Sequence, residues 1–146
     1  MSLSDKLVAD MKEAMKAKDK VRLATIRMVR AAQKEAEIDR HKELNDEELV
    51  EIIVHQVKMR RDALPEYEKA NRAETVQQLQ EEIKVLKGYL PEQLNEDEIR
   101  NLIRETIEHT GATGPQDMGK VMKDLMPGLK GRADGKLINQ LVKEML

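Results

Sequence analysis

The chain has 146 residues, enough for one compact domain or two small ones, and its 40% hydrophobic and 37% charged residues are typical of a globular protein. The absence of Cys excludes a disulfide scaffold, a thiolate nucleophile and a Cys-ligated metal site. With no Phe, no Trp and only Tyr67 and Tyr89, the core must be aliphatic and rich in Met, which favours helix over sheet. The net charge of −2 does not by itself indicate a polyanionic partner.

Helix signals run through the first half of the chain and predict four helices. The expected N-caps are, in order, Ser4, Asp19, Asn45 and Asn71. Asn45 and Glu48 have the spacing of a capping box. Asn71 and Glu74 repeat that spacing. Pro65 is expected to kink or end the third helix, because proline lacks an N–H and its ring clashes with the preceding turn.

Glycine and proline between residues 88 and 94 mark the best domain boundary. Beyond it, three shorter helices are predicted, the first beginning at Asn95 and the second at Pro115. Pro127, Gly128 and Gly131 are expected to break the second of these, and Asp134 to cap the third. The predicted fold class is all-α, with a four-helix N-terminal domain over residues 1–92 and a three-helix C-terminal domain over residues 93–146.

Charge is banded along the chain. Residues 12–34 carry a local charge of +6, residues 35–54 a charge of −6, and the segment from Met118 to the end a charge of +3. The basic stripe of the first band consists of Lys12, Lys16, Lys20, Arg27 and Arg30. Such a band is either a contact surface for a charged partner or a solvated helix face.

The residues do not assemble into a catalytic centre. His41, His55 and His109 lie in different predicted elements, and no two have the spacing of metal ligands on one helix. The serines are Ser2 and Ser4, and no nucleophile-elbow motif is present. The sequence therefore predicts no catalytic residue, no metal ligand and no cofactor.

A glycine-rich segment near the C-terminus is the candidate binding site. Gly128 and Gly131 form a G-x-x-G pattern between two predicted helices, and Gly135 follows at the start of the last one. Glycines let a backbone approach phosphate closely, and N–H groups at a helix start attract anions. The basic residues that would contact phosphate are Lys120, Lys123, Lys130, Arg132 and Lys136. The alternative is a helix breaker flanked by solvated lysines.

Motifs in both halves carry a resemblance to a known family. They are residues 117–123 (DMGKVMK), 131–139 (GRADGKLIN) and 141–143 (LVK), with residues 26–31 (IRMVRA) and 89–94 (YLPEQL) in the first half. Over essentially the whole chain the sequence resembles the YqeY family. Residues 95–146 also resemble the tail domain of GatB, the tRNA-handling subunit of the tRNA-dependent amidotransferase. The resemblance implies a helical N-terminal domain joined to a three-helix tail.

The function that this resemblance implies is association with the amidotransferase system, a glutamine-dependent carbon–nitrogen ligase. Three hypotheses follow: a tRNA- or RNA-binding accessory module, a protein–protein adaptor for a tRNA-handling enzyme, and an amidotransferase acting on its own. The last is disfavoured because the chain lacks the amidase serine–lysine machinery and a nucleotide site. GatB tails commonly have Asn-Pro where this chain has Asp134 and Gly135, and we interpret Asp134 as a helix cap.

No stretch of about 18 apolar residues is present, so no membrane association is expected. The first residues lack the apolar region of a secretory signal. A cytoplasmic location is the resulting expectation.

Overall fold

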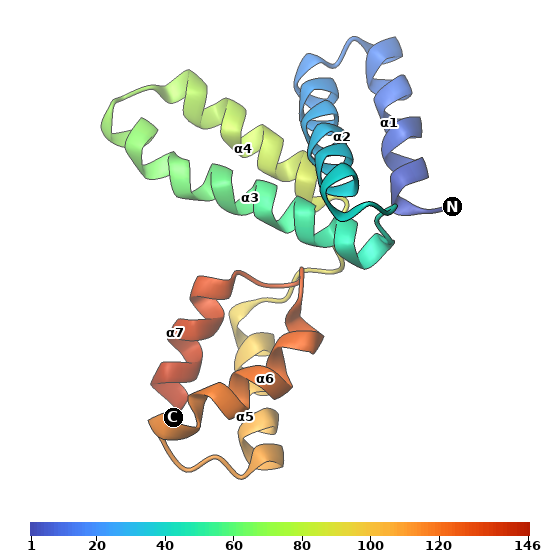
Figure 1. Ribbon diagram of the computed structural model, residues 1–146. Coiled ribbons are helices and arrows are strands. Elements are labelled where there is room, and N and C mark those ends of the chain that lie inside the picture. Colours follow the sequence, from blue (N-terminus) through green and yellow to red (C-terminus); the bar gives the residue numbers. More distant parts are fainter. The chain divides into compact units, whose positions relative to one another are not determined.

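The computed structural model describes residues 1–146, and all of its regular elements are helices (Figure 1). The elements are α1 (Leu3–Ala17), α2 (Lys20–Arg40), α3 (Asp46–Lys69), α4 (Ala73–Lys87), α5 (Glu96–Thr110), a 3₁₀ turn (Pro115–Asp117), α6 (Met118–Leu129) and α7 (Gly135–Met145). The predicted all-α fold is therefore confirmed. Backbone contacts divide the chain into two compact units, Met1–Leu90 and Pro91–Leu146. None of the helices has the length and apolar character needed to cross a membrane.

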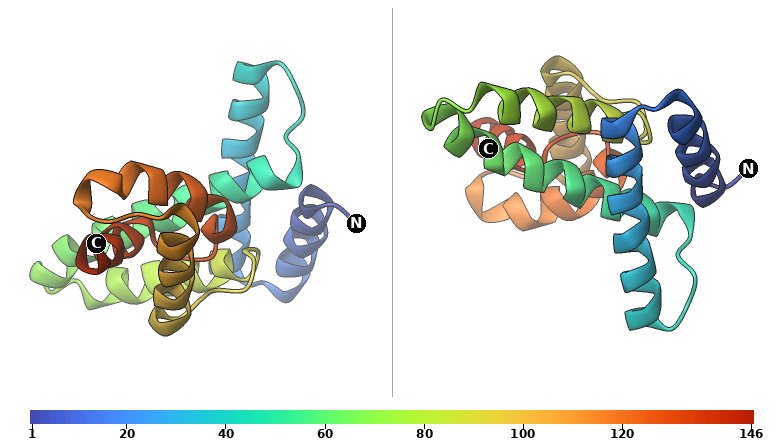
Figure 2. Two further views of the ribbon diagram at one scale, coloured as in Figure 1. Left: turned by 90° about the horizontal axis from the view of Figure 1, so that it is seen from below. Right: turned by 90° about the horizontal axis from the view of Figure 1, so that it is seen from above.

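The first unit consists of two helical hairpins, α1–α2 and α3–α4 (Figure 1). Helix α2 joins them, because it packs against α3 and α4 as well as against α1. Its last turns project beyond α1 and lead into the loop before α3 (Figure 2). The buried core is aliphatic and consists of Leu7, Ile26, Val29, Leu49, Ile53, Val57 and Leu86.

One buried ion pair joins three helices of this unit. Arg60 of α3 is 6% exposed, and its Nε donates to Oε1 of Glu82 on α4 over 3.1 Å. Its Nη1 donates to the backbone oxygen and to Oε1 of Gln56, and its Nη2 lies 3.3 Å from the sulfur of Met28 on α2. The guanidinium is thus satisfied by groups from α2, α3 and α4.

Tyr89 ties the end of α4 to α1. Its hydroxyl donates to Asp10 over 2.5 Å, and Asp10 also pairs with Arg22 of α2 at 3.6 Å. Burial, reinforced by the hydrogen bond to Asp10, raises the pKa of the Tyr89 phenol above its usual value. Tyr89 therefore stays protonated and acts as a fixed donor between the two hairpins.

The second unit is a three-helix domain with its own core. Helix α6 buries Val121, Leu125 and Leu129, which lie on one face because they are four residues apart. The other buried members of the core are Ile99 and Ile103 of α5 and Ile138, Leu141 and Val142 of α7. Gly111 ends α5 in the left-handed conformation, with φ of 69°.

Two of the predicted N-caps are wrong. Helix α1 is capped by Ser2, not by Ser4, whose hydroxyl instead accepts from Nε2 of Gln33 on α2. Helix α4 has Arg72 at its cap, with no side-chain cap hydrogen bond. Asn71 cannot cap it, because it adopts the left-handed conformation with φ of 55°, whereas a cap residue is extended.

Pro65 does not end α3, whereas α6 ends between Pro127 and Gly131, within the segment expected to break it. Helix α3 continues through Pro65 to Lys69, and α6 continues through Pro127 to Leu129. A proline removes one helical hydrogen bond, which is a local cost. In α6 this cost is offset by the burial of Leu129, which is 1% exposed in the core of the second unit.

Candidate nucleic-acid interface

The five predicted phosphate contacts fall into two groups in the second unit. Lys120 and Lys123 are exposed on the outer face of α6, opposite its buried residues. Lys130, Arg132 and Lys136 lie in the turn after α6 and at the start of α7. Lys120 and Lys130 are ten residues apart, so their backbones are separated by about 15 Å along the helix. The set is therefore spread over at least about 15 Å and does not form one pocket.

The G-x-x-G pattern does not form the expected turn. Gly128 lies within the last turn of α6, and Gly135 is the first residue of α7. Only Gly131 has a conformation that favours glycine, with φ of 74°. The loop is consequently shorter than the sequence suggests, and Gly131 sets its geometry.

Substitution of these two glycines is expected to have opposite effects. Gly131→Ala should destabilise the second unit by about 1–2 kcal/mol, because a Cβ is unfavourable in the left-handed region. Gly128→Ala should be neutral or stabilise it by about 0.5–1 kcal/mol, because a Cβ there meets nothing within 4 Å and alanine favours helix. Hydrogen exchange of the Val121 and Leu125 amides measures both changes, and equal effects would contradict this assignment.

Arg132 holds the turn to the segment that precedes α5. Its Nε donates to the carbonyl of Glu92 over 3.3 Å, and its Nη1 donates to the carbonyl of Gly128 over 3.2 Å. Its own carbonyl accepts from the backbone N–H of Leu94 over 2.9 Å. The guanidinium has five N–H donors, so after these two contacts it retains donors for a further acceptor in a fixed orientation.

Gln93 also holds the turn after α6 to the segment that precedes α5, a contact that the sequence does not predict. Its Nε2 donates to the carbonyl of Gly131 over 2.7 Å and to that of Pro91 over 2.8 Å. Gly131 is buried, so its carbonyl needs a protein partner. The only sequence signal of this role of Gln93 is the 89–94 motif. Hydrogen bonds to backbone carbonyls cannot be predicted from the spacing of side chains.

The start of α7 is occupied by a carboxylate. Asp134 is the N-cap of this helix, and its Oδ1 accepts from the backbone N–H of Lys136 over 3.2 Å. The acid thereby balances the positive end of the helix dipole. Phosphate contact at this surface would therefore come from side-chain cations and not from the open helix end.

The acids beyond Met118 are engaged locally. Asp124 lies 3.4 Å from His109, Glu144 pairs with Arg100 at 3.3 Å, and Asp134 caps α7. Lys120 and Lys123 are exposed and form no ion pair. The outer face of α6 therefore keeps a positive charge available to an anionic ligand.

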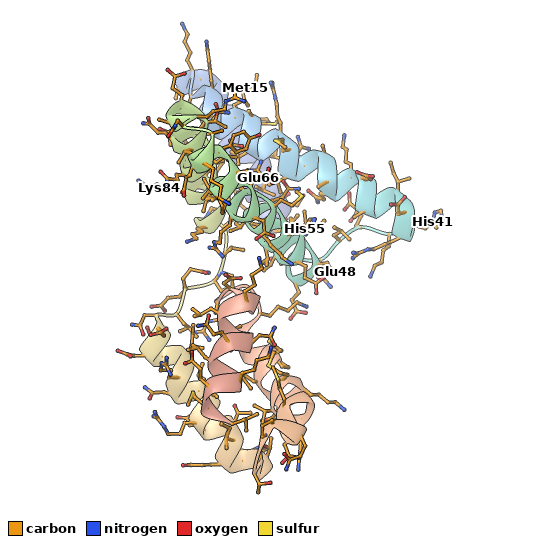
Figure 3. All side chains as sticks on the ribbon, turned by 90° about the vertical axis from the view of Figure 1, so that its left-hand side faces the viewer. Met15, His41, Glu48, His55, Glu66 and Lys84 are labelled. Carbon is orange, nitrogen blue, oxygen red and sulfur yellow. The ribbon has the colours of Figure 1, made fainter.

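The histidines lie in or at the end of separate helices, and Glu48 is engaged in ion pairs. His41 ends α2 and His55 lies on α3, well apart (Figure 3). No three His, Asp or Glu side chains gather as a metal site would require. Glu48 pairs with Lys42 and Arg40, and the hydrogen bonds from Lys42 and from the backbone N–H of Asn45 lower the pKa of its carboxyl.

Comparison with known proteins places this helical chain and its basic tail in a family. The family model described as Yqey-like protein matches residues 4–146, so the chain belongs to the YqeY family. A protein of Pyrenophora tritici-repentis named "Altered inheritance of mitochondria protein 41, mitochondrial" is 31% identical over 97% of this chain and 79% of its own length. A protein of the same name from Kluyveromyces lactis is 37% identical over 57% of this chain and 45% of its own length.

A further similarity concerns a tRNA-dependent enzyme. One of the subunits of the glutamyl-tRNA(Gln) amidotransferase of Thermococcus sibiricus is 42% identical over 48 residues. These residues are 33% of this chain and 8% of the amidotransferase chain. The likeness is thus to one small part of that enzyme.

The cytoplasmic location expected from the sequence is contradicted. The fungal relatives that match this chain are named as mitochondrial proteins. Composition and the lack of a secretory pattern do not distinguish these compartments, because mitochondrial import is directed by a basic amphipathic leader rather than by features of the folded domain.

Proposed function

We propose that this protein is a non-catalytic tRNA- or RNA-binding accessory protein associated with the tRNA-dependent amidotransferase system. The observation that carries the proposal is the grouping of exposed Lys120 and Lys123 on α6 with Arg132 in the following turn, where two carbonyls hold the guanidinium with donors to spare. The 48-residue similarity to a chain of an amidotransferase supports tRNA as the RNA.

The contacts would be to phosphate and not to bases. Lys120, Lys123, Lys130 and Lys136 supply point charges, and Arg132 supplies a directed donor. The chain has no Phe and no Trp, and both of its tyrosines lie in the first unit. Base stacking at this surface is therefore not available, and recognition would rest on backbone charge and RNA shape.

Fluorescence anisotropy of labelled tRNA over a salt series tests the proposal. The double variant Lys120→Gln/Lys123→Gln should lose about two phosphate contacts, each contributing a slope of about 0.7–0.9 in log affinity against log salt. Between about 50 and 200 mM salt, the affinity of the native protein should therefore fall about tenfold more than that of the variant.

A matched control removes the same number of positive charges from a different helix. Lys58→Gln/Lys69→Gln removes two exposed lysines from α3 and should bind tRNA like the native protein. Equal losses in the two double variants would show that only net charge matters. Failure of the native protein to bind tRNA at low salt would overturn the proposal.

An adaptor role is the second candidate, and exposed methionines favour it. Met28 and Met59 are 50% and 44% exposed, and Met28 contacts the buried Arg60. Methionines suit adaptable protein interfaces. Co-sedimentation with a purified tRNA-dependent amidotransferase tests this role, and Met28→Gln/Met59→Gln should abolish co-sedimentation without changing tRNA affinity.

A further inference from the structure

The α1–α2 hairpin carries a second concentration of positive charge. Lys20, Arg27 and Lys34 of α2 are spaced seven residues apart, so they lie within about 40° of one another around the helix. All three are exposed. The row spans about 21 Å along α2. Between its members, at the exposed positions 24 and 31, the side chains are alanines, which leave room for a partner to approach.

Side-chain contacts between α1 and α2 show which edge of α1 borders the row of cations on α2. Arg30 donates from Nη1 to the sulfur of Met11 over 3.5 Å, and Gln33 donates to Ser4 over 3.1 Å. On the solvent side of Met11, helical spacing places Lys12 and Met15. Met15 lies at the end of α1 that is remote from His41 (Figure 3). We call Lys12, Lys20, Arg27, Arg30 and Lys34 the hairpin cations.

Two acids of α1 lie on the other edge of the hairpin. Asp10 and Glu13 of α1 both lie near the guanidinium of Arg22, at 3.6 and 3.7 Å, on the side where Tyr89 packs. No carboxylate pairs with any of the hairpin cations. The hairpin thus separates these cations from Asp10 and Glu13, which are engaged with Arg22.

This separation does not stabilise the fold. Lys20 is the first residue of α2, and the neighbouring Asp19 is engaged as the N-cap of that helix, where its Oδ1 accepts from the backbone N–H of Arg22 over 3.2 Å. Like charges in one row also repel one another. An arrangement that costs stability and leaves the cations unpaired points to an anionic ligand outside the chain.

We propose that the hairpin cations form a second RNA-binding surface, which contacts the phosphate backbone; this inference rests on the proposed function. A nucleic acid fits better than an acidic protein helix, because the face offers a row of charge and small side chains but no aromatic anchor of the kind that protein interfaces use. RNA binding would then involve both compact units of the chain, one through α6 and the following turn and one through α2.

The triple variant Lys12→Gln/Arg27→Gln/Lys34→Gln in the full-length protein tests the inference, with labelled tRNA as the probe. Three lost phosphate contacts should make the affinity of the native protein fall about 30-fold more than that of the variant between about 50 and 200 mM salt. The control, Lys58→Gln/Lys69→Gln/Lys87→Gln, removes three exposed lysines from α3 and α4 and should leave tRNA binding unchanged. The variant should keep native circular dichroism, because its three positions are exposed.

The outcomes separate this inference from the proposed function. If the native protein binds no tRNA, both fail. If it binds tRNA, and the α6 double variant weakens binding while the hairpin triple variant behaves like its control, only the hairpin surface is wrong. If the triple variant loses affinity for polyglutamate but not for tRNA, the face belongs to an acidic protein partner and the inference is overturned.

Discussion

Glu82→Ala is expected to lower the free energy of unfolding of the first unit by about 3–5 kcal/mol, a large share of the stability of a small domain. The substitution leaves Arg60 buried, 6% exposed, without the carboxylate that neutralises it. The amide of Gln56 and the sulfur of Met28 remain as acceptors, but neither carries a charge. An unpaired buried cation is far less stable than a solvated one.

Urea unfolding followed by tyrosine fluorescence measures this loss, because Tyr67 and Tyr89 both lie in the first unit. The double variant Arg60→Met/Glu82→Leu provides the control. It removes both charges and fills the space with apolar groups, so it should recover most of the lost stability. A loss below about 1 kcal/mol in Glu82→Ala would mean that the pair behaves as a solvated surface ion pair.

Ile103→Ala is expected to destabilise the second unit strongly while the stability of the first is unchanged. Ile103 is fully buried among residues of α5, α6 and α7, and such truncations cost about 2–5 kcal/mol. The total stability of a unit as short as Pro91–Leu146 is about 3–8 kcal/mol at typical values per residue. The substitution therefore removes most of the free energy of unfolding of this unit.

Amide hydrogen exchange resolves the effect by region. Protection should fall strongly over Pro91–Leu146, while tyrosine fluorescence of the first unit stays native. Ile38→Ala provides the control, because Ile38 is 71% exposed on α2 and its truncation should change stability by less than about 0.5 kcal/mol. Loss of both units together would show that they unfold as one cooperative body.

Much of the fold could be predicted because local signals agree with packing. Asn45 and Asn95 form capping boxes with Glu48 and Glu98, as their spacing indicates. The last residue of α6 could not be predicted in the same way, because burial of Leu129 offsets the local cost of Pro127. Local sequence shows the cost of a proline but not the tertiary contact that offsets it.

The candidate site was less predictable from the sequence. The basic residues were identified, but their division between the face of α6 and the turn depends on how far α6 extends. Contacts of Gln93 and Arg132 with backbone carbonyls bring together segments about 40 residues apart, which spacing cannot reveal. The hydrogen bond between Tyr89 and Asp10 likewise joins residues about 80 positions apart, which spacing cannot reveal.

The most direct test of RNA binding is fluorescence anisotropy of labelled tRNA with the native full-length protein, from low to physiological salt, with plain duplex RNA as the competitor. We expect binding that prefers tRNA and weakens steeply as salt rises, because lysines and arginines supply the contacts. Absence of binding at low salt, or binding indifferent to salt, would contradict this expectation.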